Sequence, residues 1–123
     1  MEYLINENRP IFVQIAEWIE NDIVAGELPE EAQVPSTNQF ASFYQINPAT
    51  AARGVNLLVD QGMLYKKRGL GMYVAPGART KLLEKRREKF FEQYIMPLLQ
   101  EAEKLGITME QVTEMIHRRV EVP

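Results

Sequence analysis

The sequence predicts a mainly helical protein with one small β-hairpin, and three observations carry that prediction. Two short helical segments, residues 37–44 and 48–61, are joined by a tight turn. Two short apolar strands around a basic, glycine-containing turn follow at residues 63–75. An amphipathic helical tail comes last. A helix that can enter a groove beside a cationic hairpin is the layout of a winged helix-turn-helix, which we expect at residues 1–77, followed by a two-helix segment at residues 78–123.

The first helix is expected over residues 10–25. Pro10 suits a first helical turn, and Gly26 is a natural stop. Trp18 lies next to the apolar stripe of this helix and is expected to pack rather than to bind a ligand. The stripe recurs at helical spacing and consists of Phe12, Ile15, Ala16, Ile19 and Ile23.

Each of the next two helices begins at a residue that can cap it. Ser36 is followed three residues later by Gln39, which is a capping-box pattern. Asn47 is a second N-cap, and Pro48 follows it in the first turn. Gly54 costs about 1 kcal/mol in a helix interior relative to alanine. We therefore expect Gly54 to permit a close approach of the second helix. The apolar side of the third helix consists of Ala51, Val55 and Leu58.

The hairpin is expected to pair residues 63–66 with residues 72–75. Both runs are rich in aromatic and apolar residues, and the loop between them contains two glycines. The dipeptide Pro76-Gly77 marks the expected domain boundary.

The tail is expected to form one helix over residues 79–104 and another that Thr108 caps together with Gln111. Pro97 removes a backbone hydrogen bond from the first of these helices and should kink it. So short a segment cannot bury its large apolar side chains alone, so they must pack on the first domain or on another chain. The second option predicts a homodimer. Its candidate dimerisation residues are Leu83, Phe90, Tyr94, Ile95, Leu98, Val112 and Ile116.

Composition narrows the class of protein. There is no cysteine, so a disulfide framework and a thiolate metal site are excluded, and the one histidine, His117, offers no cluster for a metal. No secretory signal and no membrane-length apolar run is present, so a cytoplasmic location without membrane contact is expected. Phosphate-binding loops, H-E-x-x-H and nucleophile elbows are all missing. We expect neither an enzyme nor a cofactor.

Charge is distributed unevenly along the chain. The formal net charge is −3, but residues 66–89 carry nine basic and two acidic side chains, whereas residues 1–65 carry two basic and nine acidic ones. A local cationic block matters more to a polyanion than the overall sum does. The alternative is a basic helix face over residues 79–89 that is simply solvated.

Several side chains suit contacts with double-stranded DNA. Helix N-termini at Ser36 and Asn47 attract phosphate, and Arg53 suits a bidentate contact with a guanine edge. Gly69 and Gly71 permit a tight loop that can approach a narrow groove. Other roles stay open for each of these residues. Ser36 and Asn47 could be helix caps alone, and the glycines could be turn residues alone. Arg53 could be a solvated charge, or it could pair with Asp60 or with a glutamate of the first helix.

The chain resembles the GntR family of bacterial transcription regulators, within it the short YtrA-like branch. The resemblance spans nearly the whole chain, and the order and spacing of its motifs are specific. They are Pro10 with Gln14-Ile15, Gly26-Glu27-Leu28, Val34-Pro35-Ser36, Asn47-Pro48-Ala49-Thr50, Gln61-Gly62-Met63-Leu64, Arg68-Gly69-Leu70-Gly71-Met72-Tyr73-Val74 and Leu105-Gly106-Ile107-Thr108.

The resemblance implies a repressor that binds a palindromic operator as a homodimer, with the recognition helix in the major groove and the wing in the minor groove. Two modes of control stay open: an effector of unknown identity at the dimer interface near Phe90, Phe91 and Tyr94, or control through the level of the protein alone. The expected DNA-binding residues are Ser36, Thr37, Asn38, Asn47, Pro48, Ala49, Thr50, Arg53, Lys67, Arg68, Gly69 and Gly71.

The chain departs from the family pattern at Asn38, at Leu70 and in the third helix, where Leu57 and Val59 occupy positions that are often polar. Asn38 stands where the family usually has arginine, which removes a charged contact, and Leu70 stands at a wing position that is commonly polar. Asn38 and the acidic first 65 residues leave a second hypothesis open, a protein-interaction adaptor on a winged-helix scaffold that does not bind DNA. Single-strand or RNA binding is a third and would need exposed stacking aromatics.

Overall fold

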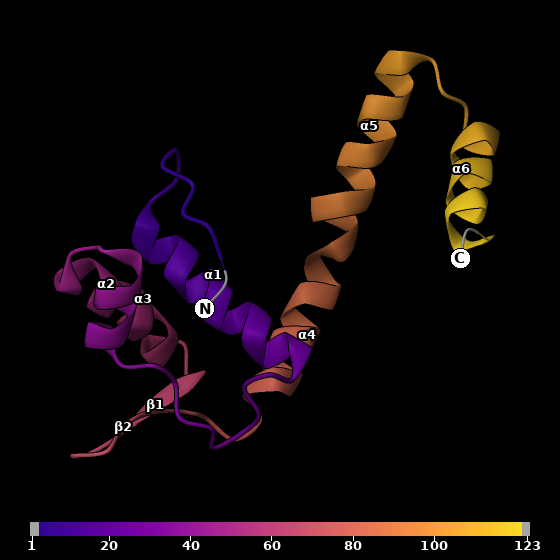
Figure 1. Cartoon of the computed structure of the whole chain (residues 1–123). Helices are drawn as coiled ribbons and strands as arrows, with labels where there is room; N and C mark the ends of the chain where they lie inside the picture. Colours follow the sequence, from indigo (N-terminus) through magenta and orange to yellow (C-terminus); the bar gives the residue numbers. More distant parts are fainter. Residues whose placement is uncertain (1–2, 122–123) are drawn as a thin grey trace. The chain divides into compact units, whose positions relative to one another are not determined.

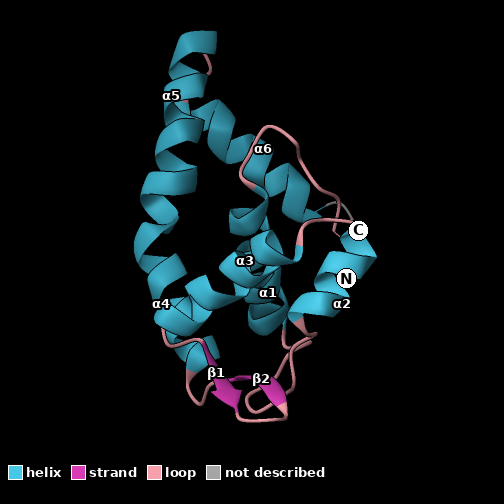
Figure 2. Cartoon of the chain, turned by 90° about the vertical axis from the view of Figure 1, so that its left-hand side faces the viewer, coloured by secondary structure: helices cyan, strands magenta, loops and turns pink. Residues whose placement is uncertain are grey.

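The computed structural model describes residues 3–121 and consists of helices and one two-stranded antiparallel hairpin (Figures 1 and 2). This confirms the predicted fold class. The chain forms two compact units, which divide between Glu84 and Lys85. Each unit is described separately below.

Helix α1, Ile11–Ala25, is the central helix of the first unit. Ile15, Ile19 and Ile23 are fully buried along one face, as their spacing predicts. Pro10 occupies the N-cap position, and Gly26 ends the helix in the left-handed conformation. Trp18 is buried among other aromatic rings, so its expected packing role is confirmed.

The segment before α1 is held by one buried glutamine that the sequence analysis did not single out for this role. The Gln14 amide nitrogen donates to the carbonyl oxygens of Asn6 and Arg9, at 2.6 and 3.0 Å. Its carbonyl oxygen accepts from the Asn6 N–H at 2.8 Å. A buried polar side chain is tolerated when its hydrogen bonds are satisfied, and this one fixes the N-terminal segment against α1.

Helices α2, Thr37–Tyr44, and α3, Pro48–Asp60, begin where the caps predict. Ser36 and Gln39 form a complete capping box, with side-chain bonds of 3.1 and 2.7 Å to each other's backbone N–H. The Asn47 side chain accepts from the Ala49 N–H at 2.8 Å. The turn between the helices uses Gln45 in the left-handed conformation, with φ of 52°.

Gly54 permits a close helix approach, but its neighbour is α1 and not α2 as the sequence suggested. A Cβ atom built on Gly54 would lie 2.6 Å from the Phe12 carbonyl oxygen and 3.0 Å from the Cβ of Ile15. The expectation of contact with the second helix is therefore wrong. The glycine is needed because the backbones of α1 and α3 cross at this point.

The hairpin pairs β1, Leu64–Lys67, with β2, Gly71–Val74, in the register Leu64↔Val74 to Lys67↔Gly71. Residues 31–34 run along the free edge of β2. The Val34 N–H donates to the Met72 carbonyl and the Val74 N–H to the Ala32 carbonyl, both at 2.9 Å. The loop before α2 therefore supports the hairpin through backbone hydrogen bonds.

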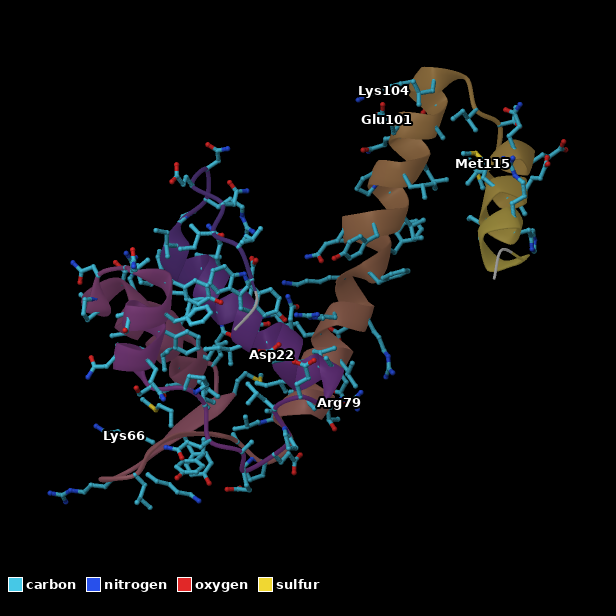
Figure 3. All side chains as sticks on the ribbon, viewed as in Figure 1. Asp22, Lys66, Arg79, Glu101, Lys104 and Met115 are labelled. Atoms are coloured by element: carbon cyan, nitrogen blue, oxygen red, sulfur yellow. The ribbon has the colours of Figure 1, made fainter. Side chains whose placement is uncertain are left out.

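Helix α4, Ala78–Phe90, begins in the first unit. Ala78 and Leu82 are fully buried in its core, and the Arg79 guanidinium Nε donates to the Val24 carbonyl at the end of α1, at 3.1 Å (Figure 3). The compact first unit therefore extends past residue 77, the boundary drawn from the sequence. Leu82 was missed because the predicted apolar stripe passed through Leu83, which is only partly buried.

The second unit contains a π-helical turn at Phe91–Ile95, helix α5 at Met96–Leu105 and helix α6 at Met109–Glu121. The Met96 N–H donates to the Phe91 carbonyl, five residues back, just before Pro97. A proline ring crowds the preceding helical turn, and the widened π-turn accommodates it. Thr108 and Gln111 form the predicted second capping box, with bonds of 2.9 and 3.1 Å.

Candidate nucleic-acid interface

All the predicted DNA-binding residues lie in the first unit, on α2, α3 and the hairpin or at their starts. Helix α3 packs against both α2 and β1. The interface is described below from these three elements.

The start of α2 presents an exposed helix N-terminus. Ser36 and Asn38 are exposed, and Thr37 is partly buried. Because the Ser36 N–H and hydroxyl oxygen are used within the capping box, what remains for a phosphate is the hydroxyl proton and the next backbone N–H groups. Asn38 adds a neutral amide but no charge. The N-terminal end of α2 is therefore better suited to bind a phosphate than to read a base.

The start of α3 is more exposed still. Asn47, Pro48 and Ala49 are exposed, and Thr50 is partly buried. The Asn47 oxygen caps the helix, while its amide nitrogen makes no hydrogen bond to the described part of the chain. Asn47 can therefore act as a cap and as a phosphate donor at the same time, so the two roles do not compete.

One face of α3 points away from the core. Ala49, Arg53 and Asn56 recur at i, i+4 and i+7, opposite the buried Ala51, Val55 and Leu58. Ala52 and Asn56 also line an open hollow beside Arg53. Asn56 was not among the predicted site residues, although its spacing of three from Arg53 could have revealed it. Its side-chain amide is of the type that recognises an adenine edge.

Arg53 is held by an aromatic ring. Its guanidinium carbon lies 3.8 Å from the centroid of the Phe12 ring on α1, which is a cation–π contact. The ion pairs considered from the sequence, with Asp60 or a glutamate of α1, are not the contact that forms. Phe12 therefore supports Arg53, the one basic side chain on the exposed face of α3, from behind that face.

The hairpin tip is a three-residue loop, Arg68-Gly69-Leu70, between the strands. Gly69 and Gly71 have φ of 77° and 120°, values that favour glycine. A Cβ atom on Gly71 would also lie 2.9 Å from the Gln33 amide nitrogen, which donates to the Leu70 carbonyl at 2.8 Å. The two glycines thus have structural reasons to be present, and Leu70 is 63% exposed at the tip.

The basic side chains of the hairpin differ in whether other side chains of the protein already contact their charges. The Lys67 ammonium lies 3.8 Å from a Glu31 carboxylate oxygen and 4.2 Å from the centroid of the Tyr73 ring. The Tyr65 hydroxyl donates to the same carboxylate; this hydrogen bond raises the pKa of Tyr65, burial adds to the rise, and Lys67 partly offsets it. Lys66 and Arg68 are exposed, and Lys66 projects outward from the hairpin (Figure 3). These two are the available cations of the wing.

The predicted dimerisation residues fall into two groups. Phe90, Tyr94, Leu98 and Ile116 are exposed, whereas Leu83 and Ile95 are partly buried. Val112 is only 8% exposed within its own chain, as is Ala102. Val112 therefore packs within the second unit and offers little surface to a partner.

Residues 3–121 contain no group of three histidine, cysteine, aspartate or glutamate side chains placed to hold a metal ion. None of the helices in that range is long and apolar enough to cross a membrane.

Together, the fold and the cationic hairpin beside an exposed helix define a winged helix-turn-helix protein of the DNA-binding class. Residues 12–74 match the family model described as bacterial regulatory proteins, gntR family. The chain belongs to the GntR family of transcriptional regulators, as its sequence motifs predicted, and neither its fold nor its relatives are those of an enzyme.

Three related proteins illustrate the match. The HTH-type transcriptional repressor YtrA of Bacillus subtilis (strain 168) is 27% identical over 107 residues, which is 87% of this chain and 82% of YtrA. A crystal structure of a GntR-family transcriptional regulator from Bacteroides thetaiotaomicron is 31% identical and covers 90% of this chain and 96% of its own, with a TM-score of 0.69. The DNA-binding domain of AraR in complex with operator ORX1 is 26% identical, covering 61% of this chain and 92% of its own, with a TM-score of 0.52.

Proposed function

We propose that this regulator binds a palindromic operator as a homodimer and acts as a repressor. The observation that carries the proposal is the exposed face of α3 around Arg53, beside a hairpin with two free cations. Its proposed partner is bacterial chromosomal DNA, so its place of action is the cytoplasm. The DNA complex of the AraR domain, whose fold this chain shares, supports this reading.

Each element has a distinct task in the proposed complex. The exposed face of α3 lies in the major groove, where Arg53 and Asn56 read base edges and the methyl groups of Ala49 and Ala52 contact thymine. The N-terminal ends of α2 and α3 bind phosphates and fix the register. The wing tip, with Arg68 and the two glycines, enters the minor groove, where Lys66 adds a salt-sensitive contact to phosphate.

The second unit supplies the proposed two-fold contact. It exposes many large apolar side chains for its size, and a single helix pair cannot bury them. A symmetric contact with a second copy covers them and places two reading helices on two half-sites. Those exposed side chains are Phe90, Phe91, Tyr94, Met96, Leu98, Leu105, Met109, Met115 and Ile116.

The repressor assignment rests on the similarity to YtrA, a transcriptional repressor that matches this chain over most of its length. A dimer that occupies an operator within a promoter acts most simply by blocking that promoter. Single-copy reporter fusions, compared with and without the gene, test this point. Higher reporter activity in its absence supports repression, and lower activity contradicts it.

Selection of bound duplexes from a genomic library, followed by sequencing, tests the DNA-binding proposal. We expect an inverted repeat, and the selected duplex should lose affinity steeply as salt rises. Arg53→Ala should abolish preference for that duplex while circular dichroism stays unchanged; Lys104→Ala, the same loss of charge on α5, is the control. The absence of any enriched motif, together with weak salt dependence, would support the adaptor alternative instead.

Sedimentation equilibrium tests the homodimer. We expect a dimer at micromolar concentration for the full chain and a monomer for the double variant Phe90→Ser, Tyr94→Ser. Both side chains are exposed in the protomer, so these substitutions should leave each unit folded. A monomeric full-length protein contradicts the proposal.

A further inference from the structure

A cluster of aromatic rings surrounds Trp18 on the side of α1 that faces α2. The Trp18 ring lies 5.6 Å from that of Tyr3, centroid to centroid and nearly parallel, and 4.8 Å from that of Tyr44 at the end of α2. None of these side chains belongs to the predicted DNA-binding set.

The cluster borders a cavity of about 200 Å³. Tyr3, Trp18, Phe40 and Tyr44 supply aromatic walls, and Asp22 and Glu27 supply two carboxylates. An apolar cavity of roughly 150 Å³ is enough to hold benzene. The space therefore suits a small organic molecule of comparable size, and it lies wholly within the first unit.

The carboxylates give the cavity a negative character. Asp22 accepts a hydrogen bond from the Tyr3 hydroxyl at 2.7 Å, and neither Asp22 nor Glu27 forms an ion pair within the described residues. The hydrogen bond to Asp22 raises the pKa of Tyr3 to about 12, with burial and the charges of Asp22 and Glu27 adding to the rise. Two unneutralised carboxylates beside electron-rich rings attract a cation and repel an anion.

One polar group at the cavity also lacks a regular partner. The Tyr44 hydroxyl is buried and makes no hydrogen bond of ordinary geometry to the described residues. Burial raises the pKa of Tyr44, and the backbone N–H of Tyr3 offsets this in part. The burial of the Tyr44 hydroxyl is therefore only partly compensated by its contacts.

We propose that this cavity binds a small organic cation, a quaternary or primary ammonium compound, between aromatic rings and the carboxylates of Asp22 and Glu27. Aromatic faces with nearby carboxylates recognise the charge, and the volume of about 200 Å³ favours a small ligand. The site differs from the aromatic surface near Phe90 and Tyr94, where an effector was expected from the sequence. It is independent of the DNA-binding proposal, since it requires only the free protein.

The protein contains one tryptophan, Trp18, so fluorescence excited selectively at tryptophan reports on this cavity without a contribution from the five tyrosines. The probe is choline chloride, titrated at constant ionic strength into the full-length protein while Trp18 emission is recorded. The matched control is 3,3-dimethylbutan-1-ol, which has the shape of choline without its charge. We expect a saturable change with choline and a response at least about tenfold weaker with the neutral alcohol.

Variants separate charge from structure. Asp22→Asn and Glu27→Gln should each weaken choline binding roughly tenfold. Glu101→Gln, the same charge change on α5, should leave it unchanged. Since Asp22→Asn also alters the hydrogen bond to Tyr3, Glu27→Gln decides the matter if Asp22→Asn unfolds. Lack of saturation, equal binding of the neutral alcohol, or unchanged affinity in Glu27→Gln overturns the proposal.

Discussion

The guanidinium carbon of Arg53 lies 3.8 Å from the centroid of the Phe12 ring, across the contact between α3 and α1. A long, flexible arginine loses side-chain entropy when it binds a base, and a ring that already orients it reduces that loss. Phe12 lies on α1, outside the proposed reading face. In the proposed complex, α1 therefore supports DNA recognition through Phe12, a contact that its sequence pattern, an apolar stripe, did not reveal.

Substitution of Phe12 should weaken operator binding through Arg53 alone. Phe12→Leu keeps an apolar side chain but removes the aromatic face, so we expect a loss of about 0.5–1 kcal/mol in binding free energy. Gel-shift titrations of a double-mutant cycle measure this. In an Arg53→Ala background the same substitution should have no further effect, and an equal loss in both backgrounds argues against the coupling.

Gly54→Ala should destabilise the first unit. The new Cβ would lie 2.6 Å from the Phe12 carbonyl oxygen, which is backbone and cannot move aside cheaply. Overpacking of this kind costs roughly 1–3 kcal/mol, more than the gain of about 1 kcal/mol in helix propensity. Urea denaturation measures the difference. Ala52→Gly, on the exposed side of the same helix, is the control for propensity; a more stable Gly54→Ala protein contradicts the close crossing of α1 and α3.

Glu31→Gln should increase affinity for DNA of any sequence. Glu31 lies 3.8 Å from the Lys67 ammonium and neutralises part of its charge. Removing the carboxylate frees one cation, so the slope of log affinity against log salt should steepen by about one unit. Fluorescence anisotropy with a random duplex at several salt concentrations tests this. Glu103→Gln, on α5, makes the same change in net charge and should have no such effect.

Neighbouring leucines of α4 should respond very differently to truncation. Leu82 is fully buried, whereas Leu83 is partly buried. Leu82→Ala should cost about 2–5 kcal/mol of unfolding free energy, and Leu83→Ala clearly less. Thermal denaturation of both variants makes the comparison. For the same reason a fragment ending at residue 77 should unfold, while one ending at Glu84 should fold.

Tyr3 should make stability depend on pH in the alkaline range. Its pKa is raised from 10.0 to about 12 in the folded protein, chiefly by the hydrogen bond to Asp22. The folded state holds this proton more tightly than the unfolded one, so the stabilisation is complete below pH 10 and is lost as pH rises toward about 12. Melting temperatures of the wild type and Tyr3→Phe should therefore differ most at neutral pH and converge over that interval. A constant difference excludes the linkage.

Local signals in the sequence were sufficient for most of the helices and for the hairpin. Ser36, Asn47 and Thr108 act within a few residues of themselves, so their caps could be recognised without a tertiary structure. The contact of Gly54 with α1 and the contact of Arg53 with the Phe12 ring could not be recognised in this way, because both depend on how α1 crosses α3. The same holds for Leu82, whose burial depends on which side of α4 meets the first unit. Nothing in the sequence indicated that Lys67 has an acidic partner, because Glu31 comes beside it only in the folded chain.

The pairing of residues 31–34 with β2 has a mechanical consequence. This segment is hydrogen-bonded to the wing through Met72 and Leu70, and it continues through Pro35 directly into the first turn of α2. The wing and the start of α2 are therefore connected through this hydrogen-bonded segment, a connection that does not run through α3. In the proposed complex, the phosphate-binding start of α2 and the wing are therefore linked through these hydrogen bonds as well as through α3.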